Sequence, residues 1–211
     1  MPDSALLSES GEDVPNEARR KSPGGYANGR ATREDVLHRA AAAFAEQGYH
    51  GASLRAIARS AGIDHSTLLH HFGDKTSLLL AVLAWRDEEA MRFVSADWVS
   101  AEDLRAQMAA LVEHNRSIPG LVQLYAVLSA EAATEGHPAR AFFQERAEQL
   151  ATQFEDAIRR FGTGPIPADL HARVLTYLAL WEGLQVFDAV NPGRLDIGVV
   201  LDGELGRLLG T

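Results

Sequence analysis

The spacing of apolar residues predicts a protein built from helices. From residue 32 to residue 209, apolar side chains recur every three or four positions, in stretches that capping residues, glycines and prolines separate. These stretches are 32–47, 53–61, 64–72, 75–98, 101–117, 121–128, 138–161, 168–190 and 196–209. We therefore expect an all-α fold, with a small N-terminal three-helix domain followed by a larger C-terminal helical bundle.

Residues 53–72 are predicted to form two short helices that meet at a tight turn. Ser53 and Asp64 stand where a side chain can accept a hydrogen bond from a free amide of the first turn of each helix. Gly62 ends the first helix, because glycine adopts the left-handed conformation without steric cost. The apolar residues of this segment are Leu54, Ile57, Ala58, Ala61, Ile63, Leu68 and Phe72. Their arrangement is that of a helix-turn-helix, although an αα-corner of an unrelated helical protein is the alternative.

The flanking residues extend this pattern, and together they resemble the N-terminal signature of the tetracycline-repressor (TetR) family. The residues that carry the resemblance lie between 32 and 80: Ala40-Ala41-Ala42-Ala43-Phe44, Gly48-Tyr49, Ser53, Ile57-Ala58, Ala61-Gly62-Ile63-Asp64, Leu68-Leu69-His70-His71-Phe72, Lys75 and Leu78. The resemblance implies a dimeric transcriptional regulator that binds DNA through the helix-turn-helix. It also implies an effector site between the helices of the second domain.

We divide the chain into three parts on composition and charge. Residues 1–29, rich in Ser, Glu, Pro and Gly, are expected to be a disordered tail; residues 30–76 form the helix-turn-helix domain; residues 77–211 form the effector-binding and dimerisation domain. The net charge of the chain is −9 at pH 7, and most of the acidity falls after residue 76. The basic residues Arg19, Arg20, Lys21, Arg30 and Arg33 form either a solvated tail or an arm that reaches DNA.

The geometry of a helix-turn-helix assigns the DNA contacts. Its second helix lies in the major groove, which presents His65, Ser66, Thr67 and His70 to base edges. Ser53 and Arg55, at the start of the first helix, and Lys75, at the start of the next long helix, are the candidates for phosphate contacts. The family usually has a tyrosine that bonds a phosphate where this chain has Leu69, so that contact is either taken over by His70 or absent.

The larger domain is rich in aromatic and apolar side chains, which fit either a plain core or the wall of a small-molecule pocket. The residues that we predict to line such a pocket are Trp85, Met108, Leu111, Asn115, Tyr125, Leu128, Phe154, Tyr177 and Trp181. Asn115 stands on an apolar face, where its amide must be paired either internally or by a ligand.

The stretch 168–190 is apolar on almost every side, so both of its faces must be covered. One cover comes from the chain's own core, and the other is expected to come from a second subunit. The resemblance assigns the last two helices to the dimer interface, and the residues that we predict there are Leu175, Ala179, Val186, Ile197, Leu201, Leu205 and Leu208. Burial in a monomeric core is the alternative.

Several classes of protein are disfavoured by what the sequence lacks. The chain has no cysteine, and His65, His70 and His71 do not have the spacing that places two imidazoles on one helical face, so we expect no metal. No common catalytic or cofactor-binding motif occurs, so we expect neither an enzyme nor a cofactor. With no signal segment or apolar run of membrane-spanning length, we expect a cytoplasmic protein without a membrane partner.

The sequence thus predicts a homodimeric, sequence-specific transcriptional regulator. We expect a repressor that binds a near-palindromic double-stranded operator and that a small apolar or aromatic effector releases. Two alternatives stay open: a small-molecule-binding helical protein without specific DNA binding, and an architectural helix-turn-helix protein without an effector.

Overall fold

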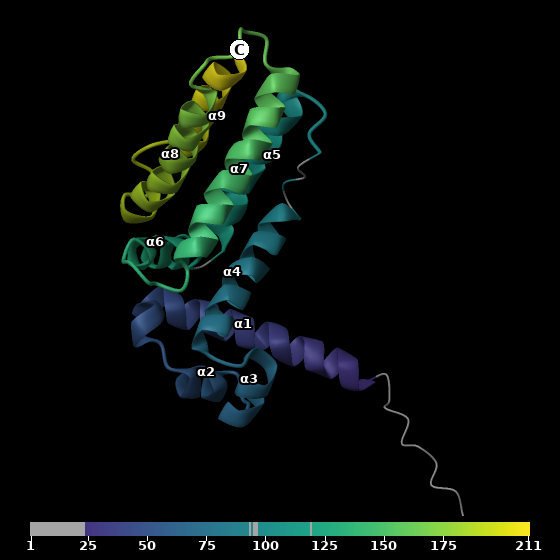
Figure 1. Cartoon of the computed structure of the whole chain (residues 1–211), viewed down its shortest axis with the longest axis vertical. Helices are drawn as coiled ribbons and strands as arrows, with labels where there is room; N and C mark the ends of the chain where they lie inside the picture. Colours follow the sequence, from purple (N-terminus) through teal and green to yellow (C-terminus); the bar gives the residue numbers. More distant parts are fainter. Residues whose placement is uncertain (1–23, 93, 95–96, 119) are drawn as a thin grey trace, which may run out of the picture.

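The computed structural model describes residues 24–92, 94, 97–118 and 120–211, and in these residues it contains helices and no strand (Figure 1). The helices are α1 (Gly24–Gly51), α2 (Leu54–Ser60), α3 (His65–Phe72), α4 (Lys75–Met91), α5 (Ala101–Ser117), α6 (Leu121–Ala132), α7 (Arg140–Phe161), α8 (Leu170–Val190) and α9 (Ile197–Leu209). The predicted all-α fold is confirmed. None of these helices is both long and apolar enough to cross a lipid bilayer.

Most helix ends fall within a few residues of where the sequence places them, and the larger differences are at the start of α1 and the end of α4. α1 begins at Gly24, inside the segment expected to be a tail, and residues 1–23 of that tail lie outside the described residues. α4 ends at Met91 rather than near residue 98. Ser53 and Asp64 do occupy the N-cap positions of α2 and α3 with extended backbones, but neither side chain accepts a capping bond. The two predicted capping bonds were therefore wrong.

The first four helices place α2 and α3 at one end of the molecule (Figure 1). Gly62 takes a φ of +69° in the turn between α2 and α3, and the Ile63 amide donates to the carbonyl of Ala58 at 3.0 Å. Side chains from all four helices are fully or almost fully buried here, among them Phe44, Ile57, Leu68 and Leu79. This core holds the two short helices rigidly against α1 and α4.

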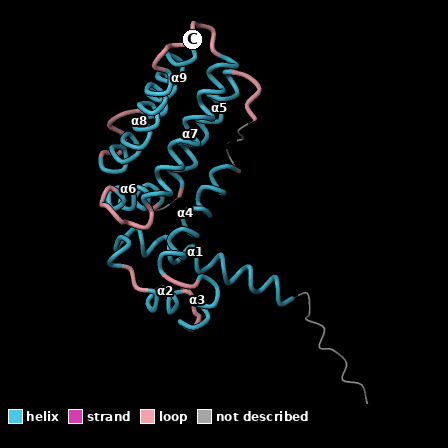
Figure 2. Tube along the Cα trace, viewed as in Figure 1, coloured by secondary structure: helices cyan, strands magenta, loops and turns pink. Residues whose placement is uncertain are grey.

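The remaining helices form a bundle at the other end of the molecule, in which α5, α7, α8 and α9 run alongside one another (Figure 2). A second apolar core, which includes Leu104, Phe154, Val174 and Leu205, fills it. Leu124 and Leu128 of α6 instead join the first core, against α1. α6 is thus the part of the C-terminal region on which the N-terminal helices rest, while α4 connects the two ends.

Candidate nucleic-acid interface and ligand pocket

One face of α3 is anchored in the protein and the other faces solvent. Leu68 and Phe72 are buried, with 0% and 7% of their surface exposed, because they pack into the first core. Of the residues predicted to read bases, Ser66 and His70 are exposed, whereas His65 and Thr67 are half-buried. Leu69 is 36% exposed, between Ser66 and His70, so an apolar side chain is also presented by this helix.

The predicted phosphate contacts flank α3. Ser53 and Arg55 are exposed at the start of α2, and because Ser53 does not cap the helix, its hydroxyl remains available to a phosphate. Lys75 is half-buried: its Nζ donates to the carbonyl of His50 at 3.1 Å and lies 4.9 Å from the centre of the Tyr49 ring. A lysine ammonium has three N–H donors, so Lys75 can hold this position and still contact a phosphate.

The basic residues near the N-terminus are described only in part. Arg33 lies with its guanidinium 5.1 Å from the centre of the Phe72 ring, at the C-terminal end of α3. Arg19, Arg20 and Lys21 lie outside the described residues, and the side chain of Arg30 is not described either. The predicted DNA-binding arm therefore stays a prediction.

The residues predicted to line a pocket are divided between the two apolar cores. Trp85, Tyr125 and Leu128 pack in the first core, while Met108, Leu111, Phe154, Tyr177 and Trp181 pack in the second. Three of them, Met108, Tyr177 and Trp181, line a hollow of about 10 Å³, which has room for about one water molecule. In the described residues the nine side chains do not surround a common cavity.

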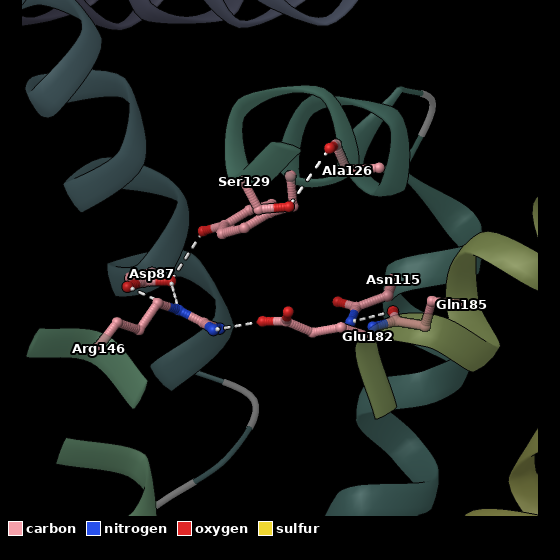
Figure 3. Close-up of polar contacts among 8 residues, drawn as sticks. Asp87, Asn115, Ala126, Ser129, Arg146, Glu182 and Gln185 are labelled. Carbon is pink, nitrogen blue, oxygen red and sulfur yellow. Dashed lines mark hydrogen bonds and ion pairs between the residues drawn. The ribbon is translucent and has the colours of Figure 1, made fainter. Parts of the chain in front are cut away.

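A polar network crosses the middle of the molecule, and Figure 3 shows the side chains of Asp87, Arg146 and Glu182 pointing toward one another. The Tyr125 hydroxyl donates to Oδ1 of Asp87 at 2.8 Å. Arg146 Nε donates to both carboxylate oxygens of Asp87, at 3.0 and 3.2 Å, and Arg146 Nη1 lies 3.6 Å from Oε1 of Glu182. This network ties α4 to α6, α7 and α8.

Burial and charge set the protonation of this network. Burial and the Asp87 carboxylate raise the pKa of the Tyr125 hydroxyl well above its usual value, so it stays a donor. Burial alone would lower the pKa of Arg146, but Asp87, Tyr125 and Glu182 outweigh burial and raise it. Asn115 is paired internally, since its Nδ2 donates to Oε1 of Gln185 at 2.8 Å.

A cavity with a volume of about 690 Å³ lies between α1, α4, α5 and α6. None of the nine predicted pocket residues lines it. Its lining includes Ala41, Ala42 and Ala45 of α1, whose small side chains leave the space open. In the sequence, the only indication of this cavity was the run of alanines, and that run does not show which helix lies across the cavity from α1.

The residues predicted at the dimer interface also fall into two groups. Ile197, Leu201 and Leu205 are buried in the chain's own second core. Leu175 and Leu208 are half-buried, and Ala179 and Val186 are exposed. The exposed large apolar side chains of α8 and α9 are Val186, Phe187, Val190 and Val199, with 39%, 44%, 74% and 68% of their surface exposed.

No group of three or more His, Cys, Asp or Glu side chains is placed to hold a metal ion within the described residues.

Comparison with known proteins agrees with this geometry. Residues 36–82, which include α2 and α3, match the family described as bacterial regulatory proteins, tetR family. The chain is 37% identical over 82 residues to the HTH-type transcriptional repressor AcnR of Corynebacterium efficiens. That match covers 39% of this chain and 41% of the repressor, so it spans about two fifths of the relative's length.

Solved structures extend the likeness to most of the chain as a likeness of fold. AibR, solved in complex with isovaleryl coenzyme A and operator DNA, has a TM-score of 0.65 at 23% identity, over 84% of this chain and 98% of that one. The SmeT–triclosan complex has a TM-score of 0.68 at 21% identity, over 85% of this chain and 90% of that one. Residues 36–82 thus match the tetR family of bacterial regulatory proteins, and most of the chain shares its fold with these two solved structures.

Proposed function

We propose that this chain is a sequence-specific DNA-binding transcriptional repressor, acts in the cytoplasm as a homodimer, and is released from its operator by a small-molecule effector. The observation that carries the proposal is the orientation of α3. Leu68 and Phe72 anchor it, so that Ser66, Leu69 and His70 face outward. A helix presented in this way fits the major groove, and the tetR-family match of residues 36–82 supports the same use. The proposal includes no catalytic activity.

In this proposal the contacts divide by role. Ser53, Arg55 and Lys75 bind phosphates on either side of the groove and fix the position of α3, because such contacts carry little sequence information. Ser66, Thr67 and His70 read base edges, with His65 near the start of the helix. In a two-fold dimer, the two copies of α3 must lie about 34–36 Å apart, or a multiple of that, to meet successive turns of the major groove, which makes the operator near-palindromic.

The exposed apolar face of α8 and α9 supports the dimer. Val186, Phe187, Val190 and Val199 leave apolar surface exposed on helices whose other faces are already buried. Such surface marks an interaction site. Of the interface residues predicted from sequence, Ala179 and Val186 lie at the surface of a single chain.

The experiment is binding to duplex DNA from upstream of the chain's own gene and to scrambled duplexes, titrated with salt. Arg55→Ala and Lys75→Ala should each weaken binding to both duplexes and reduce the salt slope by about one unit, because each removes one phosphate contact. Arg173→Ala is the matched control, since Arg173 is an exposed arginine of α8, paired with Asp169 at 2.8 Å. It should leave binding unchanged.

Base readout separates the proposal from its alternative. Substitution of Thr67 or His70 should cost about 1–3 kcal/mol at particular base pairs and leave the rest of the operator profile unchanged. The net charge of −9 and the exposed Leu69 favour, as the second candidate, a small-molecule-binding protein without specific DNA binding. Equal affinity for the upstream and scrambled duplexes would support that alternative and contradict the repressor.

A further inference from the structure

The cavity between α1, α4, α5 and α6 has the size and position of a ligand site. Its volume of about 690 Å³ lies within the range of about 300–1,000 Å³ that is usual for small-molecule pockets. Its apolar lining comprises Ala41, Ala42, Ala45, Ile118 and Leu124. These residues come both from α1, which belongs to the helix-turn-helix region, and from the α5–α6 junction. A molecule bound here therefore touches both ends of the protein.

Arg86 supplies a buried polar group that lacks a partner at this cavity. Its side chain is only 9% exposed, and its guanidinium lies 4.3 Å from the centre of the Trp85 ring. Nη1 donates to Oε2 of Glu89 at 3.1 Å, but the buried Nε finds no acceptor among the described residues. Buried N–H groups are almost always paired, because an unpaired one has lost its hydrogen bond to water without a replacement. The Arg86 side chain lines the cavity, so an acceptor on a ligand can bond its guanidinium there.

The other polar groups at the cavity favour an oxyanion as that acceptor. Arg92, just beyond the C-terminal end of α4, adds a second guanidinium, and His38 and Gln123 add side chains that can donate hydrogen bonds from α1 and α6. The lining also holds the carboxylates of Glu46 and Glu89, and Glu89 is bonded to Arg86 through Nη1, so a ligand oxyanion must bond Arg92 and the N–H groups of Arg86 that Glu89 does not occupy. Arginine binds carboxylate and phosphate groups well, because its planar N–H groups match two oxygens at once.

We propose that this cavity binds a small organic anion, a carboxylate or a phosphate ester with an apolar body, whose charged group bonds Arg86 and Arg92. The ligand's body lies against the alanines of α1. This inference rests on the proposed function, because it names the site and the chemical class of the effector. The ligand changes the affinity for DNA only if it binds one placement of α1 against α6 more tightly than another. By linkage, operator DNA must then change the affinity for the ligand by the same factor.

The test is calorimetry of the full-length chain with benzoate, phenyl phosphate and the uncharged isostere benzamide. We expect saturable binding of benzoate or phenyl phosphate, at least about tenfold tighter than binding of benzamide, because a charged hydrogen bond contributes about 1.5–3 kcal/mol. The tighter of the two anions identifies the group as carboxylate or phosphate. Binding of neither at concentrations up to about 10 mM, or equal binding of benzamide, overturns the proposal.

Three variants locate the binding. Arg86→Met keeps the stem on Trp85 and should weaken the anion about tenfold to hundredfold. Ala42→Leu fills the cavity without a change of charge, so it tests the site even if Arg86→Met is unstable, and it should abolish binding. Arg159→Met is the matched control: Arg159 also pairs with a glutamate of its own helix, Glu155 at 2.7 Å, and does not line the cavity. Unchanged affinity in folded Ala42→Leu, or an equal loss in Arg159→Met, would disprove the location.

Operator binding without ligand separates this inference from the proposed function. A chain that binds its upstream duplex specifically but binds neither anion refutes the anion site and leaves the repressor standing. A chain that binds the anion through Arg86 but shows no preference among duplexes supports the anion site and refutes the repressor. If both hold, addition of the anion should change operator affinity, and Ala42→Leu should remove that response.

Discussion

The contact between Gly48 and Glu131 yields a quantitative prediction about the junction between α1 and α6. Gly48 has φ +66° and ψ −179°, a conformation that essentially glycine alone adopts. A Cβ at this position would overlap Oε1 of Glu131 and lie 2.9 Å from its carboxyl carbon. The same carboxylate accepts a hydrogen bond from the Tyr49 amide through Oε2, at 2.6 Å. Gly48→Ala should therefore strain the backbone and also displace Glu131.

The two costs can be estimated separately. An unfavourable backbone conformation costs about 1–3 kcal/mol, and loss of a hydrogen bond to a charged group costs about 1.5–3 kcal/mol. We expect Gly48→Ala to lower the free energy of unfolding by about 3–5 kcal/mol, a large share of the roughly 5–15 kcal/mol typical of a folded protein. Gly51→Ala is the control, because a Cβ there would meet only Cβ of Gln47, at 3.3 Å. It should change stability by no more than about 1 kcal/mol.

Urea unfolding, followed by circular dichroism, measures these values, and a double-mutant cycle separates them. In a Glu131→Ala background, Gly48→Ala should cost only the backbone part, about 1–3 kcal/mol, because no carboxylate remains to be displaced. If the cost were the same with and without Glu131, the carboxylate would have no part in it. If Gly48→Ala cost no more than Gly51→Ala, the whole argument about this junction would be refuted.

Three further predictions concern the network, pH and DNA. Arg146→Met should lower the free energy of unfolding by about 2–3 kcal/mol because it removes the countercharge of the Asp87 carboxylate, which then keeps the hydrogen bond from the Tyr125 hydroxyl, and Asp87→Asn in the same chain should recover part of that loss in urea unfolding. Burial lowers the pKa of the His137 imidazole below 6.5, so the neutral ring stabilises the folded protein fully above about pH 6.5, and this contribution is lost as the pH falls through the lowered pKa. The free energy of unfolding should therefore be smaller at pH 5 than at pH 7.5. A His137→Gln chain that loses as much stability between these two pH values would contradict the assignment to His137. Leu69→Tyr should strengthen binding to every duplex by about 1 kcal/mol through a phosphate contact, as measured by fluorescence anisotropy; unchanged affinity would place residue 69 away from the backbone.

The helices were predictable because each depends on local spacing. Apolar periodicity and breaks at residues such as Gly62 place α2, α3 and the bundle helices without knowledge of their partners. The end of α4 shows the limit of this reasoning. Val94 and Trp98 continue the apolar spacing beyond Met91, but they are buried in the second core from a non-helical segment. The spacing of apolar residues indicates which side chains are buried, but a buried residue in a loop can continue this spacing as well as a buried residue in a helix.

The candidate sites were predictable to different degrees for the same reason. The predicted contacts of α2 and α3 follow from a motif whose geometry is local, so the sequence could propose Arg55 and His70, which the structure places at the surface and whose contacts stay a prediction. The cavity depends on how α1 packs against α6, two helices far apart in the chain, as the bond between Tyr49 and Glu131 shows. Aromatic content pointed instead to residues such as Phe154, which fill a core. The cavity is left open by small residues, and the pattern of hydrophobic residues in a sequence does not indicate where small residues leave space between two helices.

The junction and the cavity together suggest how a ligand would move α3. Tyr49 and Glu131 fix the C-terminal end of α1 on α6, while the cavity lies along the same helix at Ala42 and Ala45. At 1.5 Å per residue, Ala42 stands about 9 Å along the helix from Gly48. A ligand that separates α1 from α6 by about 1 Å at Ala42 would therefore turn α1 by roughly 6° about this contact. Because α2 and α3 share a core with α1, they would turn with it, and two copies of α3 in a dimer would change their spacing. A firm junction is needed for this rotation, so Glu131→Ala should weaken the response of operator affinity to the anion more than it weakens anion binding itself.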